Sequence, residues 1–117
     1  MKRKSLQELL HRYVSQYPEE KVYKAQMLEF IAEHADCFER SLAIGHITAS
    51  AWLVNKEQTH ALLMHHMKLD KWFQLGGHCD GNPDVLVVAI KEAQEESGIQ
   101  QIAEDWASSV LCSAVLR

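Results

Sequence analysis

The clearest structural signal in this chain lies between Asn82 and Ile99, where both ends of one helix are marked. Asn82 is a favourable N-cap residue, Pro83 suits the first helical position, and Asp84 puts negative charge at the positive end of the helix dipole. Gly98 stands where a left-handed residue ends a helix. One face is apolar and carries Leu86, Ala89, Ile90 and Ala93. The sequence therefore predicts an amphipathic helix over residues 83–97.

Residues 1–44 show helical spacing of apolar side chains. Ser5 and Glu8 match a capping box, which predicts a helix that ends before Pro18. A second apolar helix is expected over residues 19–35. Neither segment carries a pattern with chemistry, so we expect both helices to pack on the rest of the chain as an accessory.

The pattern changes to that of strands after the helical segment. Residues 46–54 and 59–64 are rich in β-forming side chains and are separated by a polar turn, which predicts a hairpin. A short strand over residues 72–75 is expected to run into Gly76 and Gly77. Because neither a linker nor a repeat interrupts the chain, residues 45–117 are expected to form one domain, on which the helices pack.

Composition excludes several classes of protein. With 117 residues, 47% of them hydrophobic and 24% charged, the chain is typical of a single globular unit and not of a disordered protein. No apolar stretch is long enough to span a bilayer, and no signal-peptide pattern follows the basic N-terminus. We therefore expect a cytoplasmic protein with no membrane partner.

Charge and cysteine content narrow the partners further. Twelve Lys and Arg against sixteen Asp and Glu give a net charge of −4, and the basic residues form no stripe, so no nucleic-acid partner is expected. The three cysteines, Cys37, Cys79 and Cys112, form no CxxC pair. Free thiols in a reducing compartment are therefore expected, without a disulfide framework or a zinc ribbon.

Three glutamates share one face of the expected helix, because Glu92, Glu95 and Glu96 are spaced i, i+3 and i+4. Their like charges repel by roughly a few tenths of a kcal/mol per pair. A divalent cation removes this repulsion, and Mg²⁺ or Mn²⁺ prefers oxygen ligands of this kind. The spacing alone is more typical of a solvated acidic face, so the surrounding sequence must decide between a metal site and a surface.

That surrounding sequence resembles the Nudix box, whose pattern is G-x5-E-x7-R-E-U-x-E-E-x-G-U, with U a bulky aliphatic residue. Residues 77–99 read G-x5-P-x7-K-E-A-x-E-E-x-G-I, and six positions match in register: Gly77, Glu92, Glu95, Glu96, Gly98 and Ile99. Pro83 replaces the first glutamate, and Lys91 replaces the arginine. Because Asp80 and Asp84 flank Pro83, the chain is similar to a Nudix subgroup in which the first acidic residue is displaced.

The resemblance implies a metal-dependent Nudix pyrophosphohydrolase. Its substrate is expected to be a nucleoside diphosphate linked to another moiety, and its cofactor Mg²⁺ or Mn²⁺. The expected metal ligands are Glu92, Glu95, Glu96 and a main-chain carbonyl of Gly76 or Gly77. One of the glutamates is expected to orient the attacking water, and Lys91 to hold a neighbouring carboxylate. The expected substrate-binding residues are Gly76, Gly77 and His78.

Two other functions fit the same resemblance. One is a non-catalytic Nudix-like module that binds a nucleotide or a protein partner. The other is an activity like that of prenyl-diphosphate isomerases, which share the scaffold and also carry a Gly-Gly-His-like loop. The intact three-glutamate face argues against a module that only binds, since such a module gains nothing from the repulsion.

Other reactive or aromatic residues fit ordinary roles. His65, His66 and His78 lack the regular spacing of zinc ligands, so His65 and His66 are expected to be surface or loop histidines. Cys79 has no adjacent base in sequence and is expected to be an ordinary loop thiol. Trp72 is expected to lie in the core and not to serve as a base-stacking platform.

The resemblance also implies the fold, an α/β (α+β) protein with a Nudix-type α/β/α sandwich and a mixed sheet. Eighteen residues follow Ile99, and of these Ser108–Leu116 are expected to supply one strand. We therefore expect a partial Nudix domain over residues 45–117, incomplete at its C-terminus. A sheet that stops early leaves an unpaired edge, which favours a homodimer.

Overall fold

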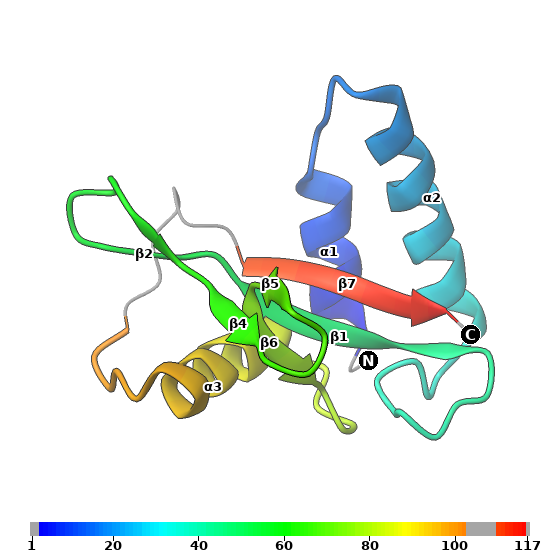
Figure 1. Ribbon diagram of the computed structural model, residues 1–117. Helices are drawn as coiled ribbons and strands as arrows, with labels where there is room; N and C mark the ends of the chain where they lie inside the picture. Colours follow the sequence, from blue (N-terminus) through cyan, green and yellow to red (C-terminus); the bar gives the residue numbers. More distant parts are fainter. Residues whose placement is uncertain (1–2, 103–109, 117) are drawn as a thin grey trace.

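The strand β1 (Gly45–Ala51) is the centre of the fold. It pairs antiparallel with β6 (Leu75–His78) on one side and with β7 (Val110–Leu116) on the other (Figure 1). The computed structural model describes residues 3–102 and 110–116, with only the backbone described in the second range. The strand predicted near the C-terminus is confirmed as β7, while its first two residues, 108 and 109, lie outside the described residues.

Alternation along β1 divides its side chains between two faces. Ile47 and Ala49 are fully buried and belong to the hydrophobic core, whereas the alternate residues Thr48 and Ser50 are only half-buried. The core joins β1 to the helices and the loops beside them through Leu6, Phe30, Ile31, Cys37, Phe38, Cys79, Val85, Val88 and Ala89. The core therefore lies between one face of the sheet and the helices that pack against that face.

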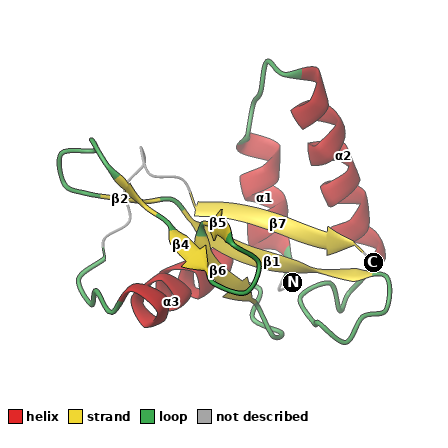
Figure 2. Cartoon of the chain, viewed as in Figure 1, coloured by secondary structure: helices red, strands yellow, loops and turns green. Residues whose placement is uncertain are grey.

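Three helices lie in the described part of the chain: α1 (Lys4–Arg12), α2 (Pro18–Glu33) and α3 (Val85–Ser97). Helix α3 packs on β6 and β1, and α1 and α2 stand beside each other as a helical hairpin (Figure 2). Leu6 of α1 and Ile31 of α2 are buried in the same core as Val88 of α3. Buried side chains of residues 3–44 thereby pack this part of the chain onto the sheet and α3.

The ends of the helices differ in part from the sequence prediction. The capping box at Ser5 is wrong, because α1 begins at Lys4 and Ser5 lies inside it, with no side-chain cap at Arg3. Helix α3 begins at Val85 and not at Pro83. The Asn82 side chain accepts a hydrogen bond from the Asp84 N–H at 2.9 Å, and this local turn moves the N-cap to Asp84.

The opposite end of α3 is confirmed. Gly98 adopts the left-handed conformation with φ of 77°, and its N–H donates to the carbonyl of Gln94. A residue with a Cβ atom is strained in the left-handed conformation, which explains why glycine ends the helix here.

Between β1 and β6 the chain forms a ribbon of two short hairpins: β2 (Leu53–Val54) with β3 (Ala61–Leu62), and β4 (Met64–His66) with β5 (Lys71–Phe73). The predicted hairpin is confirmed, with Asn55 and Gln58 closing its turn. Two details are wrong. The expected strand 46–54 breaks at Trp52, and part of the expected polar loop 65–70 is strand β4.

The molecule is thus a mixed α+β protein, as the sequence predicts at this level. Every strand pair among the described residues is antiparallel, so the expected mixed sheet is not confirmed, and neither is the α/β/α sandwich. Among the described residues, no helix combines the length and the apolar character that crossing a bilayer requires.

Candidate functional site

The carboxylate of Glu92 lies directly against the backbone of Gly77. A Cβ atom added at Gly77 would lie 2.7 Å from the Glu92 carboxyl carbon and about as close to both of its oxygens. Helix α3 supplies the carboxylate, β6 supplies the glycine, and any larger residue at position 77 would occupy the space of the acidic group. The first glycine of the Nudix-like pattern and its first matching glutamate therefore meet in space.

A second carboxylate reaches the preceding glycine. Oε1 of Glu96 accepts a hydrogen bond from the N–H of Gly76 at 2.9 Å. Glu92 and Glu96 are four residues apart on α3, and Gly76 and Gly77 are adjacent in β6, so the two carboxylates follow the strand backbone side by side. This arrangement brings together four of the residues that the sequence predicts for the site.

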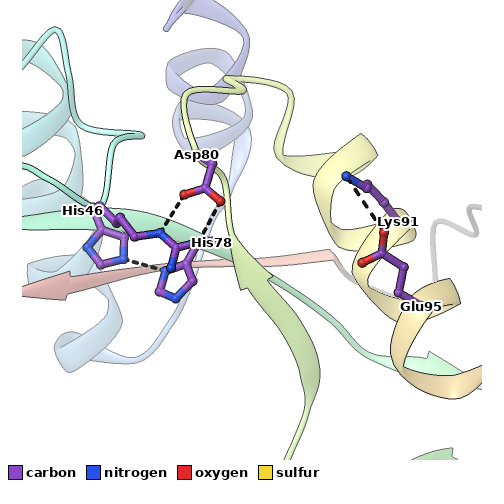
Figure 3. A network of polar contacts seen from close by, with 6 residues as sticks. His46, His78, Asp80, Lys91 and Glu95 are labelled. Carbon is purple, nitrogen blue, oxygen red and sulfur yellow. Dashed lines mark hydrogen bonds and ion pairs between the residues drawn. The ribbon is translucent and has the colours of Figure 1, made fainter.

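Glu95 points to a different neighbour. Its Oε1 lies 3.9 Å from Nζ of Lys91, one turn earlier on α3, and both side chains are exposed (Figure 3). Lys91 therefore lies beside a carboxylate of the cluster, and that carboxylate is Glu95. An exposed ion pair of this kind contributes little to stability, so Glu95 is not fixed in this position.

The surroundings of Glu92 raise the pKa of its carboxyl group. This side chain is half-buried, and burial raises its pKa, with the negative charges of Glu95 and Glu96 adding to the effect. Lys91 and His78 act in the opposite direction. The ionised form of Glu92 is therefore unfavourable in this position, and a bound cation would stabilise it.

His78 lies at the end of β6 and is exposed. Its Nδ1 lies 3.0 Å from Nε2 of His46, which is only 2% exposed and belongs to β1 (Figure 3). Sequence reasoning placed His78 at the site but missed His46, because no motif links two residues that are 32 positions apart.

The two acidic residues that flank Pro83 are both engaged elsewhere. Asp84 caps α3 by accepting a hydrogen bond from the Val87 N–H at 3.2 Å. Asp80 accepts two hydrogen bonds from Arg40, one from Nε and one from a terminal nitrogen, each at 2.8 Å. Hydrogen bonding from Arg40 lowers the pKa of Asp80 and keeps this carboxylate ionised. Arg40 carried no signal in the sequence.

The carboxylate oxygens of Glu92, Glu95 and Glu96 are hard donors of the kind that Mg²⁺ and Mn²⁺ prefer. Within residues 3–102, no three His, Cys, Asp or Glu side chains are arranged as a complete metal-binding group. Mg²⁺ is commonly held by one or two carboxylates and completes its shell with water and substrate phosphates. Glu92 and Glu96 meet that smaller requirement, and Gly77 offers its backbone beside them.

Two other sequence predictions can be compared with the structure. Trp72 does not lie in the core, because it is 66% exposed on β5, where its ring lies 4.9 Å from that of His65. Cys79 is more buried than a loop thiol usually is, and burial raises its pKa to about 11. A thiol with so high a pKa is a poor nucleophile, as expected for this residue.

A hollow of about 330 Å³ lies elsewhere, along the connection between α1 and α2. Residues of its lining include Tyr13, Val14, Glu20, Lys24 and Leu28. None of the predicted site residues lines it, so the carboxylate cluster at β6 remains the candidate site.

No family model matches this chain, and no curated protein matches it either. The structure defines a mixed α+β protein with a carboxylate cluster over a glycine pair.

Proposed function

We propose that this protein is a metal-dependent hydrolase of the Nudix type, acting on a nucleoside diphosphate linked to another moiety. The observation that supports the proposal most strongly is the contact between the α3 carboxylates and the glycine backbone of β6. Glu92 lies against Gly77, and Glu96 accepts a hydrogen bond from Gly76. The resemblance of residues 77–99 to the Nudix box and the α/β/α sandwich that it implies belong to the same proposal.

Each residue of the cluster has a distinct part in the proposed reaction. Glu92, Glu95 and Glu96 would hold the cation, together with a main-chain carbonyl of Gly76 or Gly77. Lys91 would pair with the Glu95 carboxylate, which lies 3.9 Å from its Nζ. Gly77 leaves room for the Glu92 carboxylate and Gly76 for the backbone of β1. The exposed His78 follows them at the end of β6 as the expected substrate-binding side chain.

The chemistry is the addition of water across the pyrophosphate bond, which gives two phosphomonoesters. One of the three glutamates accepts a hydrogen bond from the attacking water and orients it. When bound, Mg²⁺ or Mn²⁺ neutralises the phosphates and lowers the pKa of a coordinated water.

An assay with a panel of nucleoside diphosphate derivatives in Mg²⁺ tests this function. A coupled phosphatase specific for phosphomonoesters converts the products into free phosphate. We expect Mg²⁺-dependent phosphate release with at least one member of the panel. Binding of a nucleotide without any product would instead favour a non-catalytic module, and rearrangement of a prenyl diphosphate without phosphate release would favour an isomerase.

Substitution of the glutamates tests the site itself. Glu95→Gln and Glu96→Gln are each expected to lower Mg²⁺ affinity and to abolish hydrolysis, with the fold intact or slightly more stable because repulsion is relieved. Metal affinity by calorimetry and unfolding by urea measure the two effects separately. Parental turnover in both variants would contradict the metal-site assignment.

Lys91→Ala provides the matched comparison on the same helix. It removes the partner of Glu95 but no ligand, so we expect a milder loss of metal affinity than in either glutamine variant. Unchanged turnover in this variant would show that Lys91 is only a solvated side chain.

A further inference from the structure

The loop of residues 79–84 joins β6 to α3 and so connects the two halves of the carboxylate cluster. Gly77 lies just before the loop and Glu92 lies on the helix after it, so the course of the loop sets how the two meet. A loop that carries this task must itself be held in place, and the contacts that hold it come from residues 37–40.

Backbone contacts provide the first part of this attachment. The N–H of Gly81 donates to the carbonyl of Phe38 at 3.1 Å. The carbonyl of Cys37 in turn accepts a hydrogen bond from the N–H of Ile47 in β1 at 2.7 Å. Residues 37–40 are therefore hydrogen-bonded to the central strand β1 through Cys37 and to the loop of residues 79–84 through Phe38.

The side chains of Arg40 and Asp80 provide the second part. Two nitrogens of the guanidinium bind the two carboxylate oxygens, each at 2.8 Å. Paired hydrogen bonds of this geometry fix both distance and orientation, which a lysine ammonium cannot do. The ion pair is about half exposed, so its value lies in geometry more than in overall stability.

We propose that Arg40 is a positioning residue, which holds the 79–84 loop through Asp80 and thereby fixes the spacing between Gly77 and the α3 carboxylates. The inference rests on the proposed function, because metal affinity is one of its readouts. It also gives the N-terminal 44 residues a task beyond packing, since the segment that carries Arg40 lies among them.

The test compares Arg40→Ala, Asp80→Ala and the double variant, each in the whole 117-residue chain and at a temperature where all are folded. Mn²⁺ affinity is measured by electron paramagnetic resonance of the free ion. We expect each single variant to bind Mn²⁺ about tenfold more weakly, within the range known for residues that orient metal ligands. The double variant is expected to bind Mn²⁺ no more weakly than either single variant, because each single change already removes the Arg40–Asp80 pair.

Two further variants separate positioning from general stability. Arg40→Lys keeps the charge but loses the paired geometry, so we expect only partial recovery of affinity. Asp70→Ala removes a hydrogen bond with His65 on the β4–β5 hairpin, outside the loop, and is expected to leave Mn²⁺ affinity unchanged. Hydrogen exchange of residues 79–84 is expected to accelerate in Arg40→Ala and not in Asp70→Ala.

The outcomes distinguish this inference from the proposed function. Parental Mn²⁺ affinity in Arg40→Ala, alongside weakened affinity in Glu96→Gln, would overturn the positioning role and leave the function standing. If the parent protein binds no Mn²⁺, the proposed function fails, and the role of Arg40 in metal binding fails with it. Hydrogen exchange then decides whether Arg40 holds the loop, and unchanged exchange would overturn that role as well.

Discussion

Glu92 is under two opposing influences. Burial and the charges of Glu95 and Glu96 disfavour its ionised form, whereas its place against Gly77 suits a cation ligand. A carboxyl whose pKa is raised on folding destabilises the native state wherever it must ionise. Stability therefore falls as the pH rises from the ordinary glutamate pKa through the raised pKa of folded Glu92.

We expect Glu92→Gln to stabilise the metal-free protein at neutral pH. The substitution removes two like-charge pairs, each worth roughly 0.2–0.5 kcal/mol, so the gain is expected to be about 0.5 kcal/mol or somewhat more. The gain should vanish below the ordinary glutamate pKa, where the parental carboxyl is neutral in both states. Urea unfolding across that pH range measures it, and saturating Mg²⁺ should reverse the order. A variant less stable than the parent at neutral pH would show that ionised Glu92 makes favourable contacts.

At the scale of elements, the meeting of β6 with α3 and β1 depends on the glycine pair. The two glycines face different neighbours. A Cβ at Gly76 would lie 2.5 Å from the carbonyl oxygen of Ala49 and 2.8 Å from Cα of Ser50, both in the backbone of β1. The three atoms nearest to a Cβ at Gly77 all belong to the carboxylate at the end of the Glu92 side chain. Backbone of a central strand moves at high cost, whereas a side chain rotates away.

Gly76→Ala is therefore expected to affect mainly the stability of the fold, and Gly77→Ala mainly the binding of metal. Gly76→Ala should destabilise the fold by about 1–3 kcal/mol, the usual cost of overpacking. Gly77→Ala should cost less stability but displace the Glu92 carboxylate and weaken Mn²⁺ binding. Urea unfolding and Mn²⁺ titration of both variants test this pair. Equal losses of stability with equal Mn²⁺ affinity would contradict the contrast.

For the whole molecule, the feature that bears most on association is the apolar surface of the ribbon of β2 to β5. Several large apolar side chains are exposed on it: Trp52, Leu62, Leu63, Met67, Leu69, Trp72 and Phe73. Within the described residues, β6 and β7 are the outer strands of the three-stranded sheet. Exposed apolar patches and free strand edges both promote association.

We expect the protein to form a homodimer at high concentration. Multi-angle light scattering over a range of concentrations measures this directly. The double variant Leu69→Ser, Trp72→Ser should weaken the dimer if the ribbon is the contact, while Leu9→Ser on the exposed face of α1 provides a control. A monomer at every concentration would contradict the prediction.

The sequence alone determined the features that depend on near neighbours. Helix α3, its end at Gly98 and the common face of the glutamates follow from spacing within one or two turns. The β2–β3 hairpin follows from a local turn between two β-rich runs. Even the error at the start of α3 is local, since Asn82 competes with Asp84 for the role of cap.

Only the tertiary structure decided which distant groups meet. Arg40 binds Asp80 across 40 residues, and His46 contacts His78 across 32, although neither pair has a spacing that a motif records. The register of β1 against β6 and the packing of α3 put Glu92 beside Gly77. The exposure of Trp72 was missed for the same reason, because an apolar side chain is buried only where another element covers it, and that depends on the whole fold.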